Sequence, residues 1–349
     1  MNYNSWKYDQ AFKLENGATL SSLEIAYHTY GKLNKDKSNV IWVCHALTAN
    51  SDVCDWWKGL FGEESFFNPE EYFIVCANNI GSCYGSTGPL SHNADLNNAY
   101  YALFPDITIR DMVNAHELLR KHLGIEKINT IIGGSQGGQQ VMEWNIQQPH
   151  VFENSILVAT NAFHSSWGIA FNEAQRLAIK SDRTYYSHSP TGGQKGMKAA
   201  RAIALLSYRN YNTYEATQQE EDNEKIDNFR ASSYQNYQGE KLTKRFNAYS
   251  YVTLSKAMDS HNVGRGRTSV ENALKKIQAN VLVIGVSSDI LFPPQEQQFL
   301  ARHIPGAVFE QIHSLYGHDG FLIETEQLTN VIIKFKQQIN NQPLTLTSN

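Results

Sequence analysis

The chain has 349 residues, of which 41% are hydrophobic and 18% are charged, and its formal net charge at pH 7 is −4. This composition is that of an ordinary globular protein, and the weakly negative charge argues against nucleic acid or a membrane surface as a partner. No apolar run approaches the roughly 20 residues of a membrane span, and residues 1–9 lack the apolar core of a signal peptide, so we expect a cytoplasmic protein.

Apolar runs typical of buried strands alternate with segments of helical periodicity along most of the chain. Residues 108–123 predict a helix, and Thr108 with Asp111 forms a capping box at its start. Strands are predicted at 23–30, 40–44, 72–78, 128–132, 155–160, 280–286 and 307–313, and a last helix from about 321 to 339. This alternation predicts an α/β fold with a mostly parallel central sheet flanked by helices.

The most informative segment is 131–138, where an apolar run ends in a G-x-S-x-G pattern around Ser135 and a helical pattern follows at once. A strand, a sharp turn and a helix in this order raise a serine hydroxyl above the edge of a sheet, as in the α/β-hydrolase fold. The glycines lack the Cβ atoms that would collide with the neighbouring strand and helix. The backbone N–H of Gln136 opens the helix where an oxyanion would form. The segment therefore predicts nucleophilic acyl chemistry.

A serine nucleophile needs a base and an orienting acid, and in this fold the acid and then the histidine follow the serine along the chain. Asp289 comes after the predicted strand 280–286, and His318 lies in a glycine-flanked loop after the strand 307–313. Functional groups of such sheets gather outside the carboxyl ends of the strands. We therefore expect Ser135, Asp289 and His318 to form a catalytic triad.

Structural alternatives exist for the acid and the base. Asp289 also fits the N-cap of a helix that begins near Pro293. His313 is the nearest rival of His318, but strand alternation predicts that its side chain is buried or lies against a helix. Asp111 is a poor rival of Asp289 because it fits the capping box.

The second donor of an oxyanion hole usually comes from the loop after an earlier strand. Residues 45–49 follow the predicted strand 40–44, and we expect the backbone N–H of Leu47 to act together with that of Gln136. The alternative is an ordinary exit from the strand. His45 itself fits a hydrogen-bonded core histidine better than a catalytic group.

The four cysteines, at 44, 54, 76 and 83, form no C-x-x-C pair and have no adjacent histidines at metal-ligand spacing, so no metal site is predicted. Cys44 and Cys76 fall in predicted strands and are expected to be small buried residues, and a disulfide framework is not expected. The segment 81–89 lacks the G-K-[ST] ending of a phosphate loop, so nothing supports nucleotide hydrolysis.

The distance between nucleophile and acid points to an insertion, because 289 − 135 = 154 residues exceed one strand and one helix. We expect residues 162–268 to form a mainly helical lid over the active site, on a core of residues 1–161 and 269–349. Residues 197–208 have helical apolar spacing, and 209–245 are rich in polar residues and tyrosine. The acidic run 220–222 is expected to be a solvated face.

A lid over an acyl-serine raises the question of which acceptor reacts. A transferase must shield the acyl-enzyme from water and position another nucleophile. An amino-acid acceptor would require a cation for its carboxylate and an anion for its ammonium group. Arg201 lies in an otherwise apolar helical segment, which is unfavourable without a partner, and Tyr208 lies on the same helix face. Asp319 directly follows His318.

At this point the sequence resembles the homoserine O-acyltransferases of methionine biosynthesis, within the α/β-hydrolase superfamily. The matching segments cover almost the whole chain, and together they are highly specific. They are H-A-L-T at 45–48, N-I-G-S-C-Y-G-S-T-G-P at 79–89, F-P-D-I-T-I-R-D-M-V at 104–113, G-G-S-Q-G-G-Q-Q-V-M-E-W at 133–144, A-R-A-I-A-L-L-S-Y-R at 200–209, A-M-D-S-H-N-V-G-R-G-R at 257–267 and Y-G-H-D-G-F-L at 316–322. One departure is Gln136, where the family usually has Met, and this change is expected to alter pocket polarity at most.

The resemblance implies a ping-pong reaction in which Ser135 takes the acetyl group of the co-substrate acetyl-CoA and passes it to the hydroxyl of L-homoserine. It implies that Arg201 holds the homoserine carboxylate, that Tyr208 assists and that Asp319 holds the ammonium group. It further implies no bound cofactor, small-molecule substrates as the partners and a homodimer formed through the lid. Arg265 and Arg267 are candidates for contacts with CoA phosphates, with a plain surface loop as the alternative.

Other functions stay open. Succinyl-CoA or L-serine would use the same mechanism, but a succinyl group needs an additional cation, and none is evident beside residues 45–50. An esterase or thioesterase has no need of Arg201 and Asp319. The structural alternatives are a lid salt bridge for Arg201, core packing for Tyr208 and a helix N-cap for Asp319.

Overall fold

The structure is a computed structural model that describes residues 3–341. Its centre is one sheet of eight strands, in which β1 and β6 pair antiparallel with β4 and all other neighbours are parallel. In spatial order the strands are β1 (Asn4–Tyr8), β4 (Leu23–Tyr30), β6 (Phe73–Ala77), β5 (Val40–Cys44), β9 (Ile128–Gly134), β10 (Phe152–Val158), β11 (Asn280–Val286) and β12 (Val308–Ile312). The predicted mostly parallel α/β-hydrolase sheet is confirmed.

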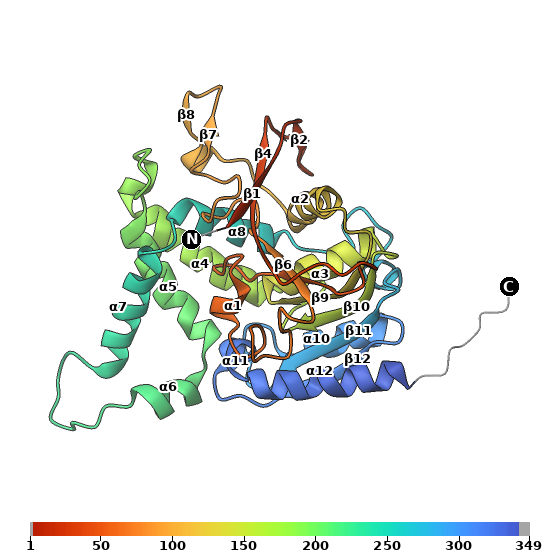
Figure 1. Ribbon diagram of the computed structural model, residues 1–349. Helices are drawn as coiled ribbons and strands as arrows, with labels where there is room; N and C mark the ends of the chain where they lie inside the picture. The colour runs from red at the N-terminus through yellow and green to blue at the C-terminus, as the bar shows by residue number, and fades with distance from the viewer. Residues whose placement is uncertain (1–2, 342–349) are drawn as a thin grey trace.

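Helices cover both faces of the sheet, because the parallel strands are apolar on both sides. All five residues of β5 are buried, as are six of the seven residues of β11. One face packs against α2 (Ile109–His122), α3 (Gln136–Gln147) and α10 (Pro294–His303), and the other against α12 (Thr325–Asn340) and residues 53–67. Two separate hydrophobic cores result, one on each side of the sheet (Figure 1).

Five longer helices lie between β10 and β11, in the segment that the sequence predicts as a lid. They are α4 (Ser166–Ser181), α5 (Gln194–Tyr208), α6 (Tyr211–Gln218), α7 (Arg230–Thr243) and α8 (Ala248–Asp259). No residue of 162–268 joins the central sheet, and α5 packs against both α4 and α7. Figure 1 shows α7 and the loop between α6 and α7 standing away from the sheet. We keep the word lid for residues 162–268; the division of the chain into two domains stays an interpretation.

Several sequence predictions need correction at their ends. The last helix is divided, because the chain bends at Glu324 between α11 (Gly320–Ile323) and α12. The strand predicted at 155–160 begins earlier, at Phe152. The antiparallel strand β1 was not predicted from the sequence. Two ladders with strands of two residues were not predicted either, namely β2 (Phe12–Lys13) with β3 (Thr19–Leu20) and β7 (His92–Asn93) with β8 (Asn98–Ala99). Such short ladders are too brief for a period of two to be recognised.

Two predictions outside the site concern the capping box of α2 and the cysteines. Thr108 and Asp111 form the predicted capping box at the start of α2, and all four cysteines are free, with Cys44 and Cys76 buried. None of the helices within residues 3–341 is long and apolar enough to cross a membrane.

Candidate active site

Ser135 lies in a strained turn between β9 and α3, with a φ of 56° that non-glycine residues rarely adopt. The neighbouring glycines make this turn possible. A Cβ atom on Gly133 would lie 2.4 Å from the backbone of Gly137, and one on Gly137 would lie 2.0 Å from the carbonyl oxygen of Cys44. The start of α3 therefore packs closely against β9 and β5. This geometry holds Ser135 at the carboxyl end of β9.

Asp289 and His318 meet behind the serine, as the sequence predicts. Nδ1 of His318 donates to Oδ2 of Asp289 across 2.6 Å, and both side chains are buried. Burial alone would lower the pKa of His318, but the charge and hydrogen bond of Asp289 raise it above its ordinary value. The second carboxylate oxygen of Asp289 accepts hydrogen bonds from the backbone N–H groups of Leu291 and Phe292. This arrangement fixes one tautomer of His318 and leaves Nε2 as the proton acceptor.

The structural alternative for Asp289 is wrong. The N-cap of α10 is Pro293, and the Asp289 carboxylate accepts hydrogen bonds from His318 and from the turn before that helix, within residues 3–341, but none from α10 itself. His313 is exposed rather than buried, because β12 is an edge strand, and its backbone pairs with the Gln327 side chain on α12.

His45 is a core histidine, as predicted. Its Nδ1 bonds the carbonyl of Ala46 at 2.9 Å, and its Nε2 accepts from the backbone N–H of Asn79 at 3.0 Å. Full burial lowers the pKa of His45 to about 4, so the ring is neutral at pH 7. Its hydrogen bonds hold the start of the loop that carries Leu47.

A cavity of about 380 Å³ opens above the serine, between the carboxyl ends of the strands and the lid. Its lining residues are Ala46, Leu47, Thr48, Ala49, Asn50, Asp55, Trp56, Ser135, Arg201, Tyr208, Lys241, Arg245, His318, Asp319, Phe321 and Leu322. Six of the eight predicted site residues are among them. The other two, Asp289 and Gln136, are buried outside the lining, and Asp289 is hydrogen-bonded to His318. No hydrogen bond joins the Ser135 hydroxyl to His318 in the described part of the chain, a contact that commonly tightens only when substrate is bound.

The side chain of Gln136 does not line this cavity. It is fully buried, and its Nε2 donates to the carbonyl of Leu254 on α8 at 3.0 Å. The expected change in pocket polarity at this position is therefore wrong. Instead, the amide connects the first turn of α3 to a helix of the lid.

Arg201 has no ionic partner among residues 3–341, so the predicted alternative of a lid salt bridge is wrong. Its guanidinium lies over the ring of Tyr208, 5.2 Å from the centroid, inside the cavity. Burial raises the pKa of Tyr208, so its hydroxyl stays protonated at pH 7. A cation and a hydroxyl thus lie next to each other in the same cavity as the serine.

Asp319 is not a side-chain N-cap, because it makes no capping bond to α11. Its carboxylate instead pairs with Arg209, at the end of α5, with an N–O distance of 3.2 Å. The sequence did not indicate this ion pair. Asp319 still lines the cavity, so a substrate ammonium would share the carboxylate with Arg209.

Sequence reasoning missed five charged or aromatic residues of the cavity, namely Asp55, Trp56, Lys241, Arg245 and Phe321. Arg245 reaches across from the lid, and its Nη1 donates to the Tyr84 hydroxyl at 2.6 Å and to the carbonyl of Thr48. Lys241 and Arg245 are four residues apart in a polar segment. Because cations at this spacing are common on solvent-exposed helices, no pattern in the sequence indicates that the two side chains line a cavity.

The arginines proposed for CoA phosphates lie elsewhere. Arg265 pairs with Glu15 at 2.8 Å, and Arg267 pairs with the buried Glu143 at 2.5 Å. Neither lines the cavity, so these residues stabilise the structure and are not available to a phosphate. The acidic run is partly paired as well, since Glu220 binds Lys225.

Known proteins resemble the chain over almost its whole length. The family model of the alpha/beta hydrolase fold matches residues 39–325. A homoserine O-acetyltransferase of Cyclobacterium marinum is 51% identical over 331 residues, which are 95% of this chain and 94% of that protein. The crystal structure of a homoserine O-acetyltransferase from Bacillus anthracis has a TM-score of 0.89 at 24% identity, and covers 99% of this chain and 98% of that one. Esterase E22 has a TM-score of 0.86 at 20% identity, with coverage of 96% and 99%.

Proposed function

The chain belongs to the homoserine O-acetyltransferases of the alpha/beta hydrolase fold, and from this premise we propose that it transfers the acetyl group of acetyl-CoA to the hydroxyl of L-homoserine. The product, O-acetyl-L-homoserine, would serve methionine biosynthesis. The observation that carries the proposal is the cavity that Ser135 lines together with Arg201, a cation that has no ionic partner among residues 3–341. A hydrolase that uses water as its acceptor has no need of such a cation.

In the first half-reaction, the Ser135 oxygen attacks the thioester carbonyl while Nε2 of His318 takes its proton. The oxyanion of the tetrahedral intermediate accepts hydrogen bonds from the backbone N–H groups of Leu47 and Gln136. Gln136 is the first residue of α3, so its N–H has no acceptor within the helix. The C–S bond then breaks, the protonated His318 gives its proton to the CoA sulfur, and acetyl-Ser135 is left.

In the second half-reaction, the homoserine hydroxyl replaces CoA. His318 takes the proton of this hydroxyl, whose oxygen attacks the acetyl carbon, and a second oxyanion forms in the same position. When the bond to Ser135 breaks, the proton returns from His318 to the serine oxygen. Asp289 stabilises the positive charge on His318 in both halves, consistent with the 2.6 Å contact.

The acceptor is recognised as a zwitterion. We assign its carboxylate to Arg201 and the hydroxyl of Tyr208, and its ammonium group to Asp319. The assignment is supported by the lack of an ionic partner for Arg201 among the described residues and by the common cavity. The ion pair with Arg209 tempers the charge of Asp319, so the ammonium group binds more weakly than it would to a free carboxylate.

The phosphates of the donor fit the lid side of the cavity. Arg201, Lys241 and Arg245 are cations in its lining, whereas Asp55 and Asp319 are the acids there and Asp319 is already paired. Within residues 3–341, the Arg245 guanidinium is bonded to the Thr48 carbonyl and the Tyr84 hydroxyl but to no carboxylate, so no carboxylate compensates its charge there. We assign Lys241 and Arg245 to the anionic part of CoA.

A succinyl donor is the second candidate, and one contact favours it. The sequence shows no cation beside residues 45–50, but Arg245 reaches the carbonyl of Thr48 from the lid and could meet an additional carboxylate there. Intact-mass measurement of the enzyme after incubation with acetyl-CoA or with succinyl-CoA, without acceptor, separates the two. We expect an acetyl adduct on Ser135; a succinyl adduct formed faster would reverse the assignment, and no adduct with either donor would contradict the acyl-serine mechanism.

We also propose a cytoplasmic homodimer formed through the lid. The support is the set of large apolar side chains exposed there, namely Leu177, Leu206, Tyr211 and Tyr237. Sedimentation of the wild type and of Leu206→Glu tests this: a dimer that the variant converts to monomer supports the proposal, and a monomeric wild type contradicts it.

A further inference from the structure

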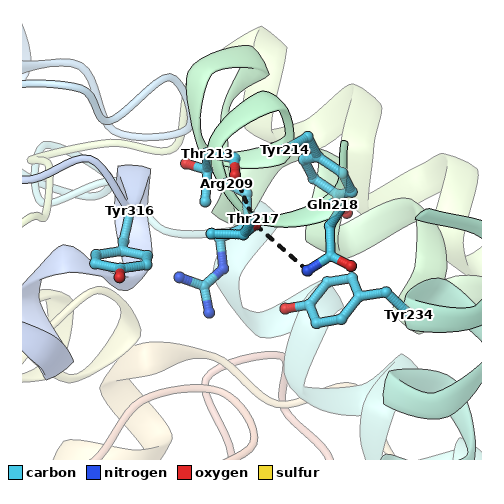
Figure 2. A pocket seen from close by; sticks show the side chains of 7 residues that line it. All are labelled: Arg209, Thr213, Tyr214, Thr217, Gln218, Tyr234 and Tyr316. Carbon is cyan, nitrogen blue, oxygen red and sulfur yellow. Dashed lines mark hydrogen bonds between the residues drawn. The ribbon is translucent and has the colours of Figure 1, made fainter. Parts of the chain in front are cut away.

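A second cavity lies next to the active site but shares no lining residue with it. It has a volume of about 150 Å³ and lies between α6, α7 and the loop before η3 (Gly317–Asp319). Its walls are Arg209, Thr213, Tyr214, Thr217, Gln218, Tyr234 and Tyr316 (Figure 2). None of these side chains is assigned a contact with a substrate in the reaction proposed above, and Arg209 acts there only through its ion pair with Asp319.

The cavity contains donors that have no acceptor. Nη2 of Arg209 pairs with Asp319, but its Nε and Nη1 are buried and have no hydrogen-bond partner within residues 3–341. The buried hydroxyl of Tyr214 is likewise unpartnered in that range. Figure 2 shows the Arg209 guanidinium pointing into the space between Tyr316 and Tyr234. Buried polar groups are nearly always satisfied in folded proteins, so three such donors around one cavity favour a ligand that supplies acceptors there.

The charge around the cavity defines the kind of acceptor. No Asp or Glu is among the seven lining residues. The carboxylate that pairs with Arg209 belongs to Asp319, which lies outside this cavity. Burial raises the pKa of Tyr214 to about 12, and its hydroxyl therefore remains a donor at neutral pH. An arginine fork and a phenol hydroxyl that face the same space match the oxygens of a carboxylate.

The walls limit the size and polarity of the ligand. The rings of Tyr214 and Tyr234 meet edge to face at 6.1 Å, and the ring of Tyr316 lies 5.2 Å from the Arg209 guanidinium. Aromatic walls suit a short apolar body beside the charged group. The volume is below the roughly 300 Å³ at which pockets for drug-sized ligands begin, so a nucleotide or a CoA molecule is too large.

We propose that this cavity, which we name the Arg209 pocket, binds a small organic carboxylate and thereby changes the affinity of the active site for its amino-acid substrate. The link is the Arg209–Asp319 ion pair, since the two side chains line different cavities and share one contact. A guanidinium can hold a carboxylate with two hydrogen bonds at either of two edges, Nη1 with Nη2 or Nε with Nη2, so a carboxylate bound at either edge competes with Asp319 for Nη2. Asp319 is then freer to bind an ammonium group, and the KM for the amino acid falls.

Linkage makes the effect reciprocal: the amino acid, when bound to Asp319, must strengthen binding of the carboxylate by the same factor. This part of the inference rests on the proposed function, because it assumes an ammonium group at Asp319. Binding of the carboxylate itself does not, and it can be measured on the full chain without substrates.

Propionate serves as the probe, and inorganic phosphate and chloride at equal ionic strength distinguish a carboxylate site from a general anion effect. We expect a saturable rise of the melting temperature with propionate. Tyr214→Phe removes one donor to a charged group and should weaken propionate binding about tenfold or more. Thr217→Phe fills the cavity and should abolish it. Tyr237→Phe, on the exposed side of α7, is the matched control and should bind like the wild type.

Two outcomes overturn the inference. The Arg209 pocket is not a carboxylate site if propionate raises the melting temperature no more than chloride does. The same conclusion follows if propionate raises the melting temperature of both Tyr214→Phe and Thr217→Phe as it does that of the wild type. If propionate binds as expected but leaves the KM for homoserine unchanged in the wild type, the link through Asp319 is wrong. An enzyme that binds propionate but does not use homoserine would contradict the proposed function and leave the site itself intact.

Discussion

The two sides of the active-site cavity are built differently. On the sheet side, Ser135, Asp289 and His318 are all buried, and each is held by the end of a strand, by backbone hydrogen bonds or by glycine contacts. On the lid side, Arg201 and Lys241 lie on helices and Arg245 in the turn after α7, and none of the three has a carboxylate partner in the described chain. In the proposed mechanism, the two sides have different tasks: the sheet side forms and breaks bonds, and the charged lid side selects the substrates.

An esterase with the same fold narrows where the difference can lie. Esterase E22 has nearly the same architecture as the chain, with a TM-score of 0.86 over 96% of it, so the fold alone, with its lid, does not distinguish an esterase from a transferase. In the proposed mechanism, the distinction comes from the side chains that the lid places in the cavity. Changes on the sheet side should therefore reduce both half-reactions, and changes on the lid side should affect one substrate at a time.

The largest effect is expected for Ser135→Ala. Removal of the nucleophile should reduce kcat by about 10⁴-fold or more, because the triad acts as a unit. Intact-mass measurement after mixing with acetyl-CoA should show no adduct. An acetyl adduct that persists in the variant would place the nucleophile elsewhere and would remove the sheet side from the comparison.

Arg201→Ala should come next. Loss of a charged hydrogen bond to the substrate carboxylate should raise the KM for homoserine by about tenfold to a hundredfold. Formation of the acetyl-enzyme should be unchanged, because Arg201 does not contact the triad. Rapid mixing with acetyl-CoA measures the first step alone. If that step slows as much as the second, Arg201 supports the fold of the site and does not select the acceptor.

Smaller effects are expected for Lys241→Gln and Arg245→Gln. Each should raise the KM for acetyl-CoA by roughly two- to fivefold at low ionic strength, since both side chains are largely exposed. The difference from the wild type should shrink as salt is added. Lys244→Gln, an exposed residue at the end of the same helix but outside the cavity, is the matched control. Equal behaviour of Lys244→Gln and Lys241→Gln would contradict a specific role.

The smallest effect concerns a partly buried carboxyl on α10, which packs against the sheet. Burial, with the nearby charge of Asp289, raises the pKa of Glu296 to about 7 from its ordinary 4.5, although Asn161 donates to it. A pKa that is higher in the folded state means that the unfolded chain loses this proton first. Stability is therefore lost as the pH rises from about 5 to about 7.

Glu296→Gln has no carboxyl to ionise and should not lose this stability. The free energy of unfolding of the variant, relative to that of the wild type, should therefore increase by on the order of 1 kcal/mol between pH 5 and pH 8. Denaturant unfolding at several pH values measures it. Parallel pH curves for the two proteins would show that Glu296 ionises normally.

The sequence predicts the sheet side well because its constraints are local. The strained turn at Ser135 requires glycines at fixed offsets, and Asp289 follows a buried strand whose apolar run is plain in the sequence. His318 lies between glycines after the next strand. Each of these signals depends on neighbours within a few residues.

The lid side is harder to predict because its roles arise from contacts between distant segments. Lys241 and Arg245 look like ordinary surface residues until α7 is placed over the cavity. The pairing of Asp319 with Arg209 joins the end of α5 to the loop after β12, 110 residues away along the chain. The side chain of Gln136 was predicted to affect the pocket, but α8 lies close enough to accept its hydrogen bond, and no sequence pattern reveals that contact.

The most direct test of the central claim, that the lid makes this enzyme a transferase, is release of free CoA thiol from acetyl-CoA with and without L-homoserine, with L-serine and succinyl-CoA as comparisons. We expect rapid release from acetyl-CoA that depends on homoserine, and little with serine or with water alone. Release at the same rate without any amino acid would mean that water is the acceptor, and would contradict the role assigned to the lid.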